Sequence, residues 1–202
     1  MLFNFFFISF YQNILLWLTV APSLVAWSME SDPSCNRETV PLNILDGTAT
    51  ILFLVFVVVE TVADNQQYAF QTEKYRKKDA GEVLTGDYAD GFCQSGLFSI
   101  IRKPNYAAEQ SIWITFYIFS VAARGGTVLL NWSAVGCILL CILFQGSGNF
   151  TEKLTLSKYP KYADYQKRVP RYVPNLFKMF EKKKNEKETH DEKTSLLGKS
   201  GK

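Results

Sequence analysis

Residues 44–62 read ILDGTATILFLVFVVVETV, a run in which apolar residues follow one another almost without interruption. Asp46 near its start and Glu60 near its end are its charged residues. A helix needs about 20 mostly apolar residues to cross the roughly 30 Å apolar core of a bilayer, where no water can satisfy a broken backbone. The stretch therefore predicts a membrane-spanning helix.

Three further apolar stretches lie around it, over residues 2–27, 106–123 and 128–144. Glu109 and Gln110 fall in the first turn of the third stretch, and Arg124-Gly125-Gly126 forms the turn before the fourth. The first stretch could instead be a cleaved signal peptide, but it lacks a basic start and is longer than a typical signal core. We predict an all-α, polytopic membrane helical bundle with about four transmembrane helices.

The basic residues fall almost entirely on one side of such a bundle. Residues 65–105 hold six of the 22 Lys and Arg residues, the stretch from residue 149 onward holds fourteen, and only Arg37 and Arg124 belong to the other side. Cytoplasmic loops carry the excess of Lys and Arg. We therefore expect the 65–105 loop and the C-terminus in the cytosol, and residues 28–43 in a lumenal or extracellular loop.

The composition excludes several kinds of function. His190 is the single histidine, so a Ser-His-Asp triad and a multi-histidine metal site are ruled out. Cys137 and Cys141 lie four residues apart in an apolar stretch and fit small packing residues, and we expect no metal site. The net charge of +3 is too small to indicate a nucleic-acid partner.

Two polar clusters lie beside the predicted spans. Glu60, Asp64 and Gln67 share one helical face at the cytosolic end of the second span, where they either snorkel to the interface or line a polar cavity. The segment from Arg102 to Glu109 reads RKPNYAAE. Its cations, amide and phenol suit a phosphate or nucleotide, although an anchor for the third helix is the simpler interpretation.

A third cluster follows the last span and is rich in tyrosine and basic residues. Tyr159, Tyr162 and Tyr165 recur every three residues, so a helix would place them on one side. The cluster is either an amphipathic helix on anionic headgroups or a lid that closes over a cofactor.

These three clusters, in this order, resemble the C-terminal half of the steroid 5-alpha-reductase superfamily, in particular its branch of poorly characterised multi-span proteins. The match runs from about residue 60 to 174, and any single element of it is weak. The matching elements are Glu60 with Ala63-Asp64-Asn65-Gln66, Gly96-Leu97-Phe98, Arg102-Lys103-Pro104-Asn105-Tyr106 with Glu109, Glu152, Tyr162-Ala163-Asp164-Tyr165 and Val173-Pro174.

The resemblance implies a helical bundle whose cytosolic end binds NADPH and delivers a hydride to a double bond of a lipophilic substrate. Glu60 would then polarise the substrate, and we group Glu109 with it as catalytic. The residues that would bind the cofactor are Arg102, Asn105, Tyr106 and also Glu109 for the nicotinamide half and its phosphates, Arg168, Arg171, Tyr162 and Tyr165 for the phosphate and adenosine end, and Glu152.

Two features depart from the pattern. Lys103 stands where the superfamily usually has histidine, and only two spans precede the 65–105 loop, so another subunit could complete the cavity. The isoprenylcysteine carboxyl methyltransferases share a similar layout and bind S-adenosylmethionine, which leaves a methyltransferase or a non-catalytic membrane scaffold as alternatives. Asn105 and Glu109 favour the reductase branch.

We therefore divide the chain into three regions: two transmembrane helices with a lumenal loop (residues 1–63), a reductase-like region (64–174), and a charged tail expected to be disordered (175–202). The expected partners are the lipid bilayer, a lipophilic small molecule and, in a homo-oligomer, a second copy of the chain. The resemblance implies the endoplasmic reticulum as the location.

Overall fold

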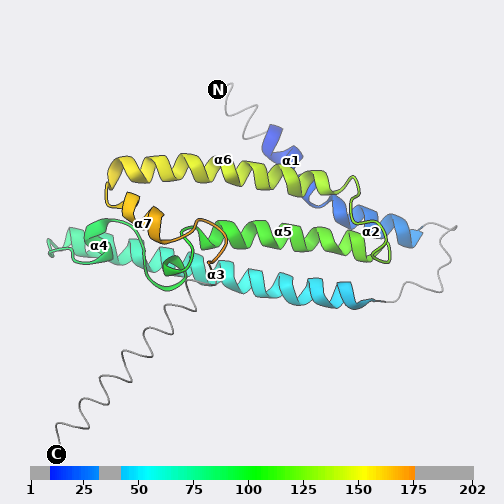
Figure 1. Cartoon of the computed structure of the whole chain (residues 1–202), viewed down its shortest axis with the longest axis horizontal. Coiled ribbons are helices and arrows are strands. Elements are labelled where there is room, and N and C mark those ends of the chain that lie inside the picture. Colours follow the sequence, from blue (N-terminus) through cyan, green and yellow to red (C-terminus); the bar gives the residue numbers. More distant parts are fainter. Residues whose placement is uncertain (1–9, 32–41, 176–202) are drawn as a thin grey trace, which may run out of the picture.

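The computed structural model describes residues 10–31 and 42–175, and within them every regular element is a helix. This confirms the all-α prediction for the described part of the chain. The long helices lie side by side in Figure 1. The helices are α1 (Gln12–Thr19), α2 (Ala21–Ser31), α3 (Ile44–Asp79), α4 (Asp87–Asp90), the single-turn 3-10 helix η2 (Gly96–Ser99), α5 (Pro104–Ala122), α6 (Ala134–Lys158) and α7 (Tyr162–Arg168).

Asn43 fixes the start of α3. Its side-chain oxygen accepts from the backbone N–H groups of Leu45 at 2.8 Å and Asp46 at 3.3 Å, and the Asp46 carboxylate accepts from the Asn43 N–H at 2.9 Å. This reciprocal arrangement satisfies N–H groups that have no partner inside the helix. The Asn43 amide also donates to the carbonyl of Ala122 at 3.0 Å, which ties the start of α3 to the end of α5.

The second predicted span continues well beyond residue 62. At 1.5 Å per residue, the 36 residues of α3 extend about 54 Å, more than the thickness of a bilayer core. Glu73 pairs with Arg76 at 2.8 Å and with Lys77 at 3.5 Å, spacings that support a helix in a charged stretch. The predicted 65–105 loop therefore begins only after Asp79, and α3 runs unbroken through the boundary at residues 63 and 64.

Helix α5 lies in the middle of the bundle and packs against α2, α3 and α6, while α1 packs against α6. The contact between α1 and α6 is close. A Cβ atom on Gly136 would lie 2.2 Å from the carbonyl oxygen of Leu18, so this position on α6 accepts only glycine without a shift of the α1 backbone.

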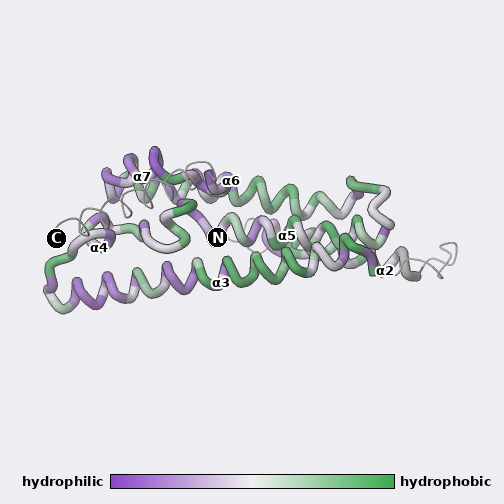
Figure 2. Tube along the Cα trace, turned by 60° about the horizontal axis from the view of Figure 1, so that its bottom comes forward, coloured by the Kyte–Doolittle hydropathy of each residue, from purple (hydrophilic) through white to green (hydrophobic). Residues whose placement is uncertain are grey.

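Two helices, α3 and α6, are long and apolar enough to cross a membrane. Large apolar side chains on both point away from the protein: Ile51 is 64% exposed, Val58 60% and Ile142 61%. Figure 2 shows these hydrophobic lengths in green, with the hydrophilic residues gathered where α3 ends and α4 and α7 lie. We call the end of the bundle formed by residues 64–106 and 147–175 the polar end.

The predicted spans at residues 106–123 and 2–27 differ from α3 and α6 in the structure. Helix α5 closely matches the predicted 106–123 span, but it is not among the helices that are apolar enough to cross by composition alone. The first stretch is not one continuous helix in its described part, because α1 ends at Thr19 and α2 begins at Ala21. Pro22 accounts for the break, since proline removes a helical N–H and clashes with the preceding turn. Residues 2–9 lie outside the described part.

Candidate functional site

A cleft of about 370 Å³ opens at the polar end, between α3, the segment that leads into α5, and the junction of α6 and α7. Its volume falls within the range of small-molecule sites. None of the described residues that line it is acidic. Its basic lining residues are Lys74, Arg102, Lys103 and Lys158, and its aromatic ones are Tyr75, Phe92, Phe98, Tyr106, Tyr159, Tyr162 and Tyr165.

Beside the cleft, Glu152 is buried, with 2% of its surface exposed, and accepts hydrogen bonds from four side chains. Arg102 Nε donates to one carboxylate oxygen at 2.9 Å, and Arg171 Nη2 donates to the other at 2.6 Å. Gln166 Nε2 at 3.0 Å and the Tyr162 hydroxyl at 3.3 Å complete the set. We call these five residues the Glu152 cluster.

The cluster compensates the burial of its carboxylate. Burial raises the pKa of Glu152, but the guanidinium groups of Arg102 and Arg171 lower it by more, so the pKa lies below its ordinary value. A buried carboxylate that is paired with two cations and fully hydrogen-bonded stays charged. Its partners lie 50 and 19 residues away in the sequence, so the cluster joins α6 to the segment before α5 and to the segment after α7.

Most of the hydrogen-bond donors of Arg102 are paired within the protein. Its Nη1 donates to the carbonyls of Gln166, at 2.9 Å, and Val169. Its backbone N–H donates to the carbonyl of Pro170 at 2.8 Å, and the next residue, Lys103, donates in the same way to Arg171 at 3.1 Å. The chain after α7 is thereby held against the start of α5, and only part of the guanidinium group faces the cleft.

Lys103 has a different environment from Arg102. Its ammonium lies 4.7 Å from the centre of the Tyr106 ring, within the range of a cation–π contact. Burial lowers its pKa below the ordinary value. In the described part of the chain, Lys103 forms no salt bridge, so its charge is free to meet a ligand.

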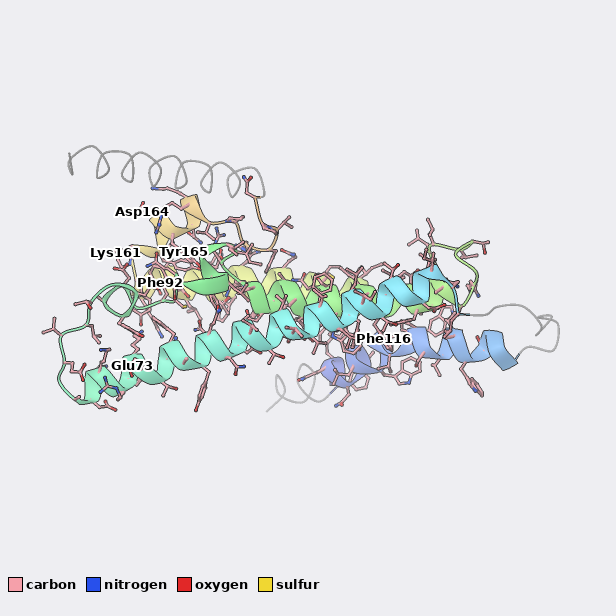
Figure 3. All side chains as sticks on the ribbon, turned by 90° about the horizontal axis from the view of Figure 1, so that it is seen from below. Glu73, Phe92, Phe116, Lys161, Asp164 and Tyr165 are labelled. Carbon is pink, nitrogen blue, oxygen red and sulfur yellow. The ribbon has the colours of Figure 1, made fainter. Side chains whose placement is uncertain are left out.

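One wall of the cleft is a cluster of aromatic rings. The ring of Phe92 lies 5.0 Å from that of Tyr162 and 5.3 Å from that of Tyr165, and Figure 3 shows Phe92 and Tyr165 together beside α7. The Tyr165 hydroxyl donates to the carbonyl of Phe98 at 2.5 Å. Burial raises the pKa of both tyrosines, so they remain neutral hydrogen-bonding groups at neutral pH.

Polar residues form two contacts between α3 and α5, one turn apart, on the side of the cleft toward the apolar part of α3. Asn105 Nδ2 donates to Asp64 Oδ1 at 3.1 Å. One turn further along each helix, the carboxyl groups of Glu60 and Glu109 interact with each other, and Glu109 also accepts from the indole N–H of Trp113 at 2.8 Å. The shared face expected for Glu60 and Asp64 therefore points at α5.

The Gly-Leu-Phe turn is held against α3 by Gln66. The backbone N–H of Leu97 donates to Gln66 Oε1 at 2.9 Å. Gly96 has a φ of +58°, and a Cβ atom there would lie 2.6 Å from the Gln66 amide. Both its backbone conformation and the close approach therefore favour glycine, and the turn places Phe98 on the cleft.

The structure brings some of the predicted cofactor-binding residues together and leaves others apart. Five of them line the cleft, namely Arg102, Asn105, Tyr106, Tyr162 and Tyr165. Glu152 and Arg171 line a separate cavity of about 210 Å³. Arg168 lines neither cavity, and its Nη2 donates to the Gln94 side chain at 2.9 Å. The two predicted catalytic residues, Glu60 and Glu109, lie together but outside the cleft lining.

Sequence reasoning found Gln67 on the face of α3 that lines the cleft, but missed the residues that follow it. Gln71 and Lys74 line the cleft together with Gln67, at spacings of three and four residues that place all three on one helical face. This spacing was a usable signal, but it applies only if the helix continues past residue 64. Lys158 was also missed, because its position depends on where α6 ends.

Residues 1–169 match the family described as "Protein of unknown function (DUF1295)", and the chain belongs to that family. An uncharacterized protein of Schizosaccharomyces pombe is 33% identical over 181 residues, which cover 87% of this chain and 50% of the relative. The chain thus spans about half the length of that relative. No solved structure matches it significantly.

Proposed function

We propose that this member of the DUF1295 family is a membrane-embedded oxidoreductase that uses NADPH to reduce a double bond in a lipophilic, steroid- or lipid-like substrate. The observation that carries the proposal is the lining of the cleft, which combines four basic side chains with several aromatic rings and, among its described residues, no acid. NADPH carries several negative charges and two flat ring systems. Lysine and arginine side chains suit its phosphates, and aromatic faces suit its rings.

The two parts of the cleft would hold different parts of the cofactor. Lys103, Asn105 and Tyr106 lie at the start of α5, next to the membrane side, and would hold the nicotinamide half and a neighbouring phosphate. Tyr162 and Tyr165 would flank the cofactor as neutral aromatic surfaces. We assign Glu152 and Arg171 a positioning role, because they hold Arg102 in place rather than face the cleft.

The carboxyl pair between α3 and α5 suits a proton donor. When bound, NADPH supplies the hydride that adds to one carbon of the double bond, and the other carbon takes a proton. Glu60 and Glu109 interact with each other between these two helices, so the pair would lie beside a substrate that enters there. Glu60 and Glu109 would supply this proton to a substrate that arrives from the membrane along α3 and α5.

This function requires a particular arrangement in the membrane. We propose that α5 and the helices before residue 32 cross the bilayer together with α3 and α6, which makes about four spans. The polar end would face the cytosol, the side that 20 of the 22 basic residues indicate and where NADPH is available. The endoplasmic reticulum is the location that the superfamily resemblance favours.

The charge of the cleft also favours NADPH over S-adenosylmethionine, the cofactor of the methyltransferase alternative. S-adenosylmethionine bears a positively charged sulfonium, which a cleft lined by four basic side chains repels. A methyltransferase of the same fold is therefore the second candidate, and a scaffold without a ligand is the third.

Direct binding tests the proposal. The full chain, purified in detergent, is titrated with NADPH and with S-adenosylmethionine, and we expect saturable binding of NADPH only. Gln71→Trp should abolish binding, because it fills the cleft that Gln71 lines. Tyr68→Trp is the matched control, because Tyr68 is on the same helix but 74% exposed and outside the cleft.

Each other outcome contradicts the proposal in a defined way. Binding of S-adenosylmethionine without NADPH would assign the chain to the methyltransferases, and binding of neither would favour the scaffold. NADPH binding that survives Gln71→Trp would mean that the cofactor site lies elsewhere in the chain.

A further inference from the structure

The basic residues of the cleft lie at two different heights, measured along the axis of α3. Gln67, Gln71 and Lys74 line it from the inner to the outer end, and at 1.5 Å per residue this wall extends about 10 Å. Asn105 bonds to Asp64, so the start of α5, with Lys103, lies at the inner level. Lys74 defines the outer level.

The outer level holds two lysines without acidic partners. Lys74 Nζ donates to the Gly91 carbonyl at 2.8 Å and to the Tyr159 hydroxyl at 3.0 Å, both of them neutral groups. Lys158 precedes Tyr159 in the chain, is exposed, and lines the same cleft. Within residues 42–175 neither lysine forms a salt bridge, so their positive charges remain uncompensated.

Two acidic residues that neighbour this level in the chain are paired with other cations. Glu73, next to Lys74 in the chain, binds Arg76 at 2.8 Å, and Asp90, next to Gly91, binds Lys161 at 2.7 Å. Figure 3 shows Glu73 and Lys161 at this end of the molecule. The outer end of the cleft is therefore an electropositive pocket separated by about two helical turns from Lys103.

We infer that Lys74 and Lys158, together with the hydroxyl of Tyr159, form a second anion subsite that takes the 2′-phosphate of NADPH and makes the cleft prefer NADPH to NADH. This inference rests on the proposed function. A phosphate monoester carries a charge of about −1.5 to −2 at neutral pH, whereas NADH has only a hydroxyl group at that position. Lysine recognises phosphate as a point charge, and the Tyr159 oxygen is held by Lys74, so its own hydrogen is free to donate.

The test uses two probes that differ only in this phosphate. The full chain in detergent is titrated with 2′,5′-ADP and with 5′-AMP, and we expect the first to bind at least ten-fold more tightly. Lys158→Gln should weaken 2′,5′-ADP several-fold and leave 5′-AMP unchanged, because Lys158 is exposed and forms no salt bridge within residues 42–175. Lys74→Gln with Lys158→Gln should remove the preference.

Lys153→Gln is the matched control. Lys153 is an exposed lysine on the same helix, but it lines the separate 210 Å³ cavity and not the cleft. If it weakens 2′,5′-ADP as much as Lys158→Gln does, the effect is one of net charge and the subsite is refuted.

The remaining outcomes separate this inference from the proposed function. Equal affinity for 2′,5′-ADP and 5′-AMP, in a chain that binds NADPH and NADH alike, would overturn the subsite and leave the reductase proposal intact. A chain that binds no nicotinamide cofactor would overturn both.

Discussion

The Glu152 cluster and the cleft beside it contain the same kinds of residue in opposite states. In the cluster, two arginines and a tyrosine surround a carboxylate that is 2% exposed, and every charge has a partner. In the cleft, three lysines and several tyrosines face an open space without an acid among its described lining residues. Arg102 and Lys103 are adjacent in the sequence, yet the first belongs to the cluster and the second to the cleft. Contact with the buried Glu152 carboxylate distinguishes the basic residues that stabilise the fold from those that remain available to a ligand.

The largest effect should follow from removal of that carboxylate's charge. Glu152→Gln keeps the size of the side chain but leaves Arg102 and Arg171 without a counter-charge in a buried site, which costs about 3–5 kcal/mol. We expect a large drop in the melting temperature of the detergent-solubilised protein, measured by tryptophan fluorescence. Glu73→Gln is the control, because it removes an exposed partner of Arg76 and should leave the melting temperature unchanged.

An unchanged melting temperature in Glu152→Gln would contradict the structural role of the cluster, because the arginines would then not need their carboxylate. Arg102 and Arg171 would then resemble the cleft lysines in needing no acidic partner, and both arginines would be candidates for ligand binding.

Acid should weaken the cluster before it affects the cleft. The pKa of Glu152 is lowered in the folded protein, so its stabilising contribution is fully present above the ordinary value of 4.5 and is lost as the pH falls through the lower folded value. The wild-type melting temperature should therefore fall below about pH 4.5. Glu152→Gln should show a smaller fall over the same range, since it has no carboxylate there to protonate. Equal pH profiles of the two proteins would contradict the assignment.

The sequence predicts the long elements better than it predicts these two sites. The apolar run of 44–62 and the spacing of Glu60 and Asp64 correctly indicate a helix with both carboxylates on one face. That this face meets α5, where Asp64 bonds to Asn105, was not predicted. The Glu152 cluster could not be predicted in this way, because Arg102 lies 50 residues from Glu152 and no local pattern relates them. The cleft was only partly predictable, because its α3 wall depends on how far that helix continues.

Lys103→Gln should affect ligand binding rather than stability, which is the opposite of Glu152→Gln. Its side chain forms no ion pair in the described part of the chain, and the cation–π contact with Tyr106 contributes about 0.5–2 kcal/mol, less than the loss expected for Glu152→Gln. Loss of one charge-assisted contact with a phosphate should weaken NADPH about ten-fold, which corresponds to about 1.4 kcal/mol. Both quantities come from one titration and one melting curve. A variant that melts much earlier but binds NADPH normally would place Lys103 with the structural residues.

The smallest effect concerns protons taken up when a ligand binds. Burial lowers the pKa of Lys103 below its ordinary value of 10.5, so it loses its proton at a lower pH than an exposed lysine. A bound phosphate favours the charged form and raises this pKa again, so NADPH binding at alkaline pH should take up a fraction of a proton. Phosphate groups, with a second pKa near 6, do not titrate in that range. Calorimetric titrations in two buffers of different ionisation enthalpy measure the uptake, and Lys103→Gln should remove it. Uptake that persists in this variant would contradict the assignment of Lys103 to a cofactor phosphate, because the proton would then be bound by another group.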